Sequence, residues 1–214
     1  GGKVVDREVC CYTGTPSDPP SIAHYDAEGN PKNGPEGWHK KFVTVQDGTV
    51  RIGYRDAGNH RVAVDLGYSD IVCIPLDEDG VMADTSEFDA FVWKCMMKPQ
   101  FLAAVFSRGA VFDACAVEAL LMAADYYCKD GEDGGDVFVN LPVSSSMADR
   151  FPGIIGWDVI KYGVGRKPVA VNGVARCVYG YDDSGELVLA LEYDAEGNRL
   201  THPEYNDDSD INLD

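Results

Sequence analysis

The chain has 214 residues, and its 36 acidic residues outnumber its 18 lysines and arginines, which gives a formal net charge of −18. A surface this acidic repels the phosphates of nucleic acids and of anionic membranes, so direct binding to either is not expected. The length suits one domain with a sizeable core, and without an apolar run of about 18 residues or a signal-peptide pattern we expect a soluble chain.

The seven cysteines predict a reducing compartment. Their number is odd, and no two have the C-x-x-C spacing of zinc or redox sites. Free thiols are most stable in the cytoplasm, so we expect a cytoplasmic protein or a virion component, with secretion left open.

Residues 1–40 are expected to form an extended N-terminal arm. Five prolines and four glycines lie between residues 13 and 37, among few residues that could be buried. This composition is typical of a long loop.

Residues 41–75 read as a β-meander. Asp47-Gly48 separates two runs of alternating apolar residues, which is a strong hairpin signal. A turn at residues 56–59 is followed by a predicted strand at residues 60–68 and by a short apolar run at residues 71–75.

Residues 84–129 carry the only long helical pattern. Phe88, Phe91, Val92, Cys95 and Met96 have the spacing of an apolar helix stripe, and residues 113–129 are apolar almost all round. We expect these helices to form the centre of the core.

Residues 136–200 read as a second meander, with Asn172-Gly173 as a hairpin turn and with Leu187, Leu189 and Leu191 alternating along a strand. Residues 201–214 form an acidic C-terminal tail. The predicted fold class is therefore α+β: residues 41–200 form a single domain of two antiparallel meanders flanking a central helical block, with extended terminal arms.

The hexapeptide YDAEGN occurs at residues 25–30 and again at residues 193–198. It can mark a duplicated unit. Because Asp–Gly–Asn turns are common, we favour the interpretation that it recurs by chance. The longer string YDAEGNRLT resembles the tyrosine–aspartate repeats of large secreted toxin shells, but we assign the chain to no family from this one nonapeptide.

Two enzymatic sites are conceivable. Cys115 lies near a predicted helix start, where a thiol is activated, although a buried structural cysteine is the better interpretation. Asp65, Asp113 and Asp158 are acids in or near apolar segments, and they would suit a divalent-metal-dependent hydrolase if the fold brings them together. Structural ion pairing is the simpler interpretation of these acids.

A calcium site is the remaining candidate. Asp208, Asp210, Asn212 and Asp214 alternate like the first ligands of an EF-hand loop, but the glycine and the bidentate glutamate of such a loop are missing. A solvated acidic tail is the alternative. No other cofactor is expected.

Charge is distributed unevenly along the chain. Residues 181–214 hold eleven acids and one base, a net −10, whereas residues 38–65 hold Lys40, Lys41, Arg51, Arg55 and Arg61 against three acids, a net +2. We expect a non-enzymatic structural or interaction protein, a subunit of a larger assembly such as a viral or phage particle. Its arms and its acidic C-terminus would contact other copies or another protein. An acidic inhibitor that mimics nucleic acid and the metal-dependent hydrolase stay as alternatives.

Overall fold

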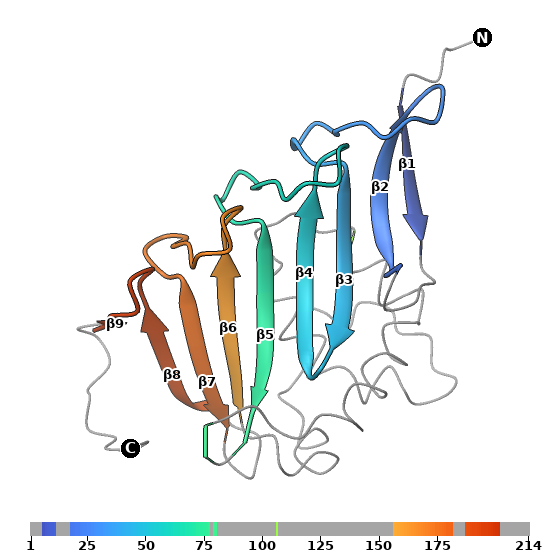
Figure 1. The fold of residues 1–214 in the computed structure, drawn as a ribbon. Helices are drawn as coiled ribbons and strands as arrows, with labels where there is room; N and C mark the ends of the chain where they lie inside the picture. Colours follow the sequence, from blue (N-terminus) through green and yellow to red (C-terminus); the bar gives the residue numbers. More distant parts are fainter. Residues whose placement is uncertain are drawn as a thin grey trace, which may run out of the picture.

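The computed structural model describes residues 6–11, 18–77, 79–80, 106, 156–181 and 187–201. Its strands form one sheet in which every strand pairs antiparallel with the next along the chain. They are β1 (Asp6–Cys11), β2 (Ser21–Asp26), β3 (Lys40–Gln46), β4 (Thr49–Arg55), β5 (Asp70–Leu76), β6 (Gly156–Tyr162), β7 (Arg176–Tyr181), β8 (Leu187–Tyr193) and β9 (Arg199–Leu200) (Figure 1).

The predicted α+β class is wrong, because the described part of the chain is all-β. The two expected meanders are one sheet: β5 pairs with β6 over seven residue pairs, from Asp70 opposite Tyr162 to Leu76 opposite Gly156. Residues 84–129, where helices were expected, lie outside the described residues except for Phe106, which is buried. In the ranges described, no helix is long and apolar enough to span a membrane. Alternation and turn residues are local signals, so they could not show that strands distant in the chain pair directly.

Most of the core lies on one face of the sheet, although Phe42, Val72 and Val178 are buried on the opposite face. Val45, Val50, Cys73, Val159 and Cys177 are paired in register across β3 to β7, and each is less than 9% exposed. Directly paired residues project to the same face, so these side chains form one continuous apolar row, which crosses the β5–β6 junction. We name this the core face. The opposite face, which carries Arg51, Arg55 and Arg176, is named the arginine face.

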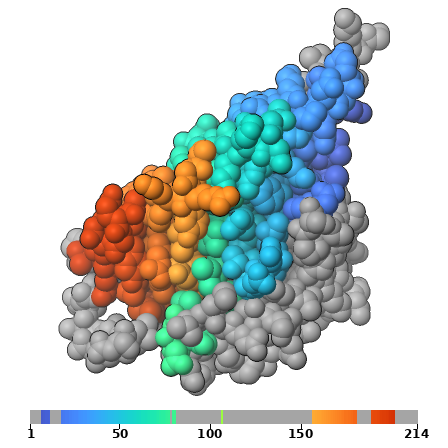
Figure 2. All heavy atoms as spheres, viewed as in Figure 1, coloured from blue at the N-terminus to red at the C-terminus, as the bar shows by residue number. Residues whose placement is uncertain are grey.

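The sheet is built from four antiparallel strand pairs, β1–β2, β3–β4, β5–β6 and β7–β8, which we call hairpins although residues 77–155 separate β5 from β6. Three long connections at residues 27–39, 56–69 and 163–175 join these pairs. All three connections lie at the same end of the sheet (Figure 1). β1 and β2 come from residues 1–40, the segment expected to be an extended arm, and β2 pairs with β3. Figure 2 shows the hairpins side by side on one face of the molecule, from blue to red.

The three connections repeat the same backbone hydrogen bonds, and the first two do so with a constant offset of 30 residues. Each connection is fixed by three equivalent N–H to O=C bonds: Asp26 to Asn30, Lys32 to His24 and Gly34 to Trp38 in the first; Asp56 to His60, Val62 to Tyr54 and Val64 to Tyr68 in the second; Gly163 to Lys167, Val169 to Lys161 and Val171 to Val174 in the third. The described part of the chain is therefore an array of one repeated structural unit.

The two YDAEGN hexapeptides occupy the same turn of this unit, which favours a duplicated unit over a chance recurrence. Asp26 and Asp194 each accept bonds from the backbone and side chain of the asparagine four residues later. The equivalent turn at residues 56–60 lacks the hexapeptide sequence but keeps the aspartate and its bond from the His60 N–H. The backbone pattern repeats more faithfully than the residues do.

Two sequence-predicted elements have a different role in this unit. Residues 60–68, predicted as a strand, belong to the second connection and hold only an isolated bridge between Arg55 and Arg61. Asn172-Gly173 does form a tight turn, with positive φ at both residues, but it closes a bridge between Val171 and Val174 within the third connection. Asp47-Gly48 joins β3 to β4, as the sequence predicted.

Candidate functional site: an arginine cluster around Asp70

Asp70 begins β5 at the connection-bearing end of the sheet, and its side chain is only 1% exposed. The Ser69 hydroxyl donates to Asp70 Oδ2 over 2.8 Å. Arg61 Nη1 lies 3.2 Å from the same oxygen, and Arg55 Nη2 lies 3.4 Å from Oδ1. A buried carboxylate is costly unless it is paired and hydrogen-bonded, and these three groups meet that requirement.

Gly53 makes room for this arrangement. It lies opposite both Phe42 and Asp70 in the sheet, and all three residues belong to the arginine face. A Cβ atom at position 53 would lie 2.5 Å from Phe42 Cζ and 2.9 Å from Asp70 Oδ1. The space left by the missing side chain holds the Phe42 ring, and the Arg55 guanidinium carbon lies 4.7 Å from the centre of that ring, in cation–π contact.

The cluster holds more positive charge than Asp70 neutralises. Burial lowers the pKa of Arg61; Asp70 acts in the opposite direction, and the nearby charges of Arg55, Arg166 and Arg51 lower it again. Among the described residues, these four arginines and Asp70 carry a summed formal charge of +3, and Asp70 contacts Arg55 and Arg61 directly. We use "arginine cluster" for Arg51, Arg55, Arg61, Arg166 and Asp70.

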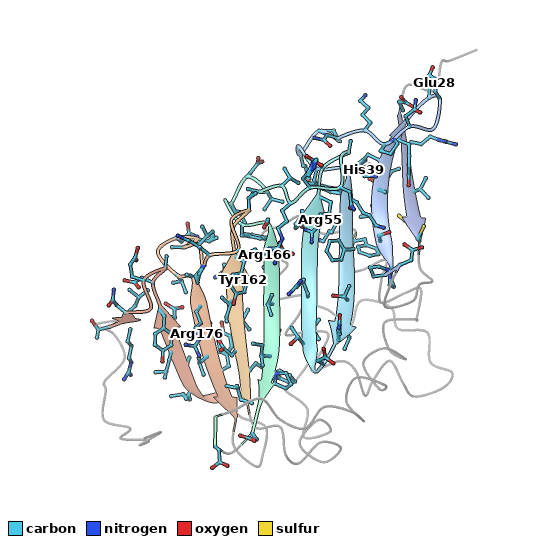
Figure 3. All side chains as sticks on the ribbon, viewed as in Figure 1. Glu28, His39, Arg55, Tyr162, Arg166 and Arg176 are labelled. Atoms are coloured by element: carbon cyan, nitrogen blue, oxygen red, sulfur yellow. The ribbon has the colours of Figure 1, made fainter. Side chains whose placement is uncertain are left out.

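Arg51 and Arg166 hold the outlying positions of the cluster. Arg51 lies two residues before Gly53 on β4, and its Nε atom is buried without an acceptor in the part of the chain that the structure describes. Arg166 is exposed and belongs to the third connection, far from the others in the chain. Figure 3 shows Arg55 and Arg166 at the connection-bearing end of the sheet.

Arg166 adopts a backbone conformation that suits glycine or asparagine. Its φ is +59°, and the equivalent positions in the other turns are Gly29, Asn59 and Gly197, each with positive φ. A residue with a bulky side chain in this region costs about 1–3 kcal/mol, and such positions concentrate at functional sites. The unit therefore accommodates a strained residue that places a cation beside the cluster.

The basic residues of the segment 38–65 do not all lie on one face of the sheet. Lys40, Arg51 and Arg55 project from the arginine face, since Lys40 pairs with Arg55 and Arg51 lies four residues, an even number, before Arg55 on the same strand. Lys41 projects from the core face, where it is 1% exposed and its Nζ lies 5.7 Å from the centre of the Tyr54 ring. Lys40 Nζ lies 3.6 Å from Asp18 Oδ1, which offsets its charge.

Asp158 and Arg176 form a second acid–arginine centre on the same face. Arg176 Nε and Nη2 donate to Asp158 Oδ1 and Oδ2 over 2.7 and 2.8 Å, a bidentate pair between β6 and β7. The hydrogen bonds to Asp158 raise the pKa of Arg176. The Arg176 guanidinium carbon also lies 5.1 Å from the centre of the Tyr193 ring.

The structure places only two of the four candidate catalytic residues. Asp158 is in this ion pair, and Asp65 is exposed in the second connection instead of lying in a strand. Asp113 and Cys115 lie outside the described residues, as do the calcium candidates Asp208, Asp210, Asn212 and Asp214. Within the described ranges, no three His, Cys, Asp or Glu residues are grouped so as to hold a metal ion.

No direct signal in the sequence marks Gly53, Ser69 or Arg166 as members of a site. Aligning the connections by their turns would have indicated Arg166, because it is the cationic residue at a position that otherwise holds glycine or asparagine. Gly53 was visible only as a glycine within a strand, a sign of close approach by other groups.

Comparison with known proteins finds no matching family model, no matching curated protein and no matching solved structure. The arginine cluster is therefore interpreted from its own geometry.

Proposed function

We propose that the chain is a non-enzymatic structural or interaction protein that acts as a subunit of a larger protein assembly. The observation that carries this proposal is the repeated unit, in which a constant backbone presents a different set of side chains at each repeat. Repeat arrays build extended surfaces of this kind, and those surfaces commonly bind other proteins.

Equivalent positions of the unit illustrate the variation. The position at the start of the first strand of a hairpin holds Lys40, Asp70 or Arg176, and the residue paired with it in the next strand is Arg55, Tyr162 or Tyr193, respectively. The backbone bonds around these positions are the same, so the side chains can differ without disturbing the sheet. Variation on a constant framework suits recognition of a partner.

Charge supports self-association as the form of this assembly. The arginine cluster is locally positive in a chain with a net charge of −18, and residues 181–214 are strongly acidic. Opposite charges on separate parts of one chain favour head-to-tail contact between copies. Such contacts weaken with salt, because the Debye length falls from about 10 Å at 0.1 M to about 3 Å at 1 M.

Sedimentation velocity of the full chain over a range of concentrations tests the proposal. At low salt we expect concentration-dependent oligomers. At 0.5–1 M salt we expect a shift toward the monomer, because exposed charges more than about 3 Å apart are largely screened at 1 M. A chain that stays monomeric at every salt and at the highest concentration would contradict self-assembly.

A further inference from the structure

We propose that the arginine cluster binds carboxylate groups of an acidic polypeptide segment. This inference rests on the proposed interaction function and names the chemistry of the partner. The ligand is a run of aspartate or glutamate side chains, and the residues that receive it are Arg51, Arg61 and Arg166.

The bound Asp70 side chain shows how the cluster holds a carboxylate. Arg55 and Arg61 approach its two oxygens, and Ser69 donates to one of them. A guanidinium group offers five N–H donors in a planar fork. One carboxylate therefore cannot accept hydrogen bonds from all the donors of four arginines. The summed formal charge of +3 among these described residues suits a ligand of the same chemistry.

An unsatisfied donor marks where such a ligand would bind. Arg51 Nε is buried, and no acceptor for it exists among the residues that the structure describes. A buried donor left without an acceptor is unfavourable, and an incoming carboxylate oxygen would remove that cost. The exposed Arg166 provides the approach from solvent.

The extent of the positive region favours a short acidic segment over a nucleic acid. The cluster reaches from β4 to the connection after β6, two strand spacings or roughly 10 Å. Along the same end of the sheet, the neighbouring turns carry Asp26 and Glu28 on one side and Asp194 and Glu196 on the other. A phosphate polymer following the sheet would meet these acids within one unit of the cluster.

Binding of a defined peptide to the full chain tests the inference. The probe is the acetylated and amidated peptide HPEYNDDSDINLD, which copies residues 202–214, and a second probe replaces its five acids with the corresponding amides. Fluorescence anisotropy at low salt measures both, with inorganic phosphate and single-stranded DNA as competitors. A full-length variant carrying the same five amide substitutions removes competition from the chain's own segment.

Arg166→Asn is the informative substitution, because asparagine suits the positive φ at this position and removes only the cation. We expect it to weaken binding of the acidic peptide about tenfold, as loss of one charged hydrogen-bonding group does. The control is Lys167→Gln, which removes the same charge from the adjacent exposed residue. Arg51→Gln should weaken binding by a similar factor.

The outcomes separate cleanly. The inference is supported if the acidic peptide binds and the amide peptide does not, and if Arg166→Asn weakens this binding while Lys167→Gln does not. This holds whether binding is seen in the wild-type chain or only in the full-length variant that carries the five amide substitutions. Four results would overturn the inference. They are equal losses of binding in both substitutions, binding of both peptides, stronger displacement by DNA than by excess acidic peptide, and no binding to either form of the chain. None of these results depends on the sedimentation measurement, so assembly through other surfaces would survive failure of this site.

Discussion

Two buried aspartates on the arginine face, Asp70 and Asp158, meet arginines in different proportions. Asp158 has one bidentate partner, Arg176, and the pair is electrically balanced. Asp70 is contacted by two arginines, with two more nearby. The balanced pair has a structural role, because it links β6 to β7. In the unbalanced cluster, the arginines outnumber the single acid that they surround. This excess of arginines is the reason for proposing that the cluster, and not the Asp158–Arg176 pair, binds a ligand.

The two centres also differ in exposure. The Arg176 side chain is 42% exposed, so water can replace part of its ion pair, whereas Arg55 and Arg61 are 16% and 18% exposed. Loss of the acid should therefore be far more damaging at the cluster, because the arginines left behind have little access to solvent.

Asp70→Asn is expected to have the largest effect. The substitution keeps the shape of the side chain but leaves four arginines without a counter-charge, so the free energy of unfolding should fall by about 3–5 kcal/mol. Urea denaturation followed by tryptophan fluorescence measures the change. Asp65→Asn, which removes an exposed acid from the same connection, is the control and should change stability by less than about 0.5 kcal/mol.

Asp158→Asn is expected to have a smaller effect, about 1–2 kcal/mol in the same denaturation experiment. The bidentate pair is lost, but the half-exposed guanidinium of Arg176 is resolvated. Asp47→Asn is its control, since Asn-Gly suits the hairpin turn that Asp47-Gly48 now forms. If Asp158→Asn destabilises the chain as much as Asp70→Asn, the contrast between a balanced and an unbalanced centre is wrong.

The local parts of the fold were predictable from sequence. Asp47-Gly48, the alternating residues around it and the apolar run that became β5 all have signals within a few residues. The β5–β6 pairing had none, because a long intervening segment separates the strands and the sequence pattern says nothing about which distant edges meet. The helical pattern at residues 84–129 favoured the α+β class, but apart from Phe106 those residues lie outside the described part of the chain, which is all-β.

Only part of the arginine cluster was predictable from the sequence. Arg51, Arg55 and Arg61 drew attention as a basic group within one segment of the sequence. Asp70 did not, because an acid at the start of an apolar run resembles any strand boundary. Arg166 became a neighbour of the group only through the β5–β6 pairing, which brings the third connection beside the second. Errors in topology therefore became errors in the membership of the site.

The turn aspartates provide a third, exposed class of carboxylate against which the two buried centres can be compared. Hydrogen bonds from the Asn30 side chain and backbone hold the pKa of Asp26 below its ordinary value, and Asn198 does the same for Asp194. A lowered pKa in the folded chain means that these turns contribute stability above the pKa of the unfolded chain and lose that contribution as the pH falls through the folded value.

Asn30→Ala should therefore raise the pKa of Asp26 and leave that of Asp194 unchanged, and Asn198→Ala should do the reverse. Carbon-detected NMR titration of the carboxyl groups measures both values in one sample. Because the two turns have the same six residues and the same hydrogen bonds, each serves as the control for the other. A matched rise at both sites in either variant would mean that long-range charge, and not the local turn, sets these pKa values. It would also weaken the assignment of charge to local groups on which the comparison of Asp70 with Asp158 depends.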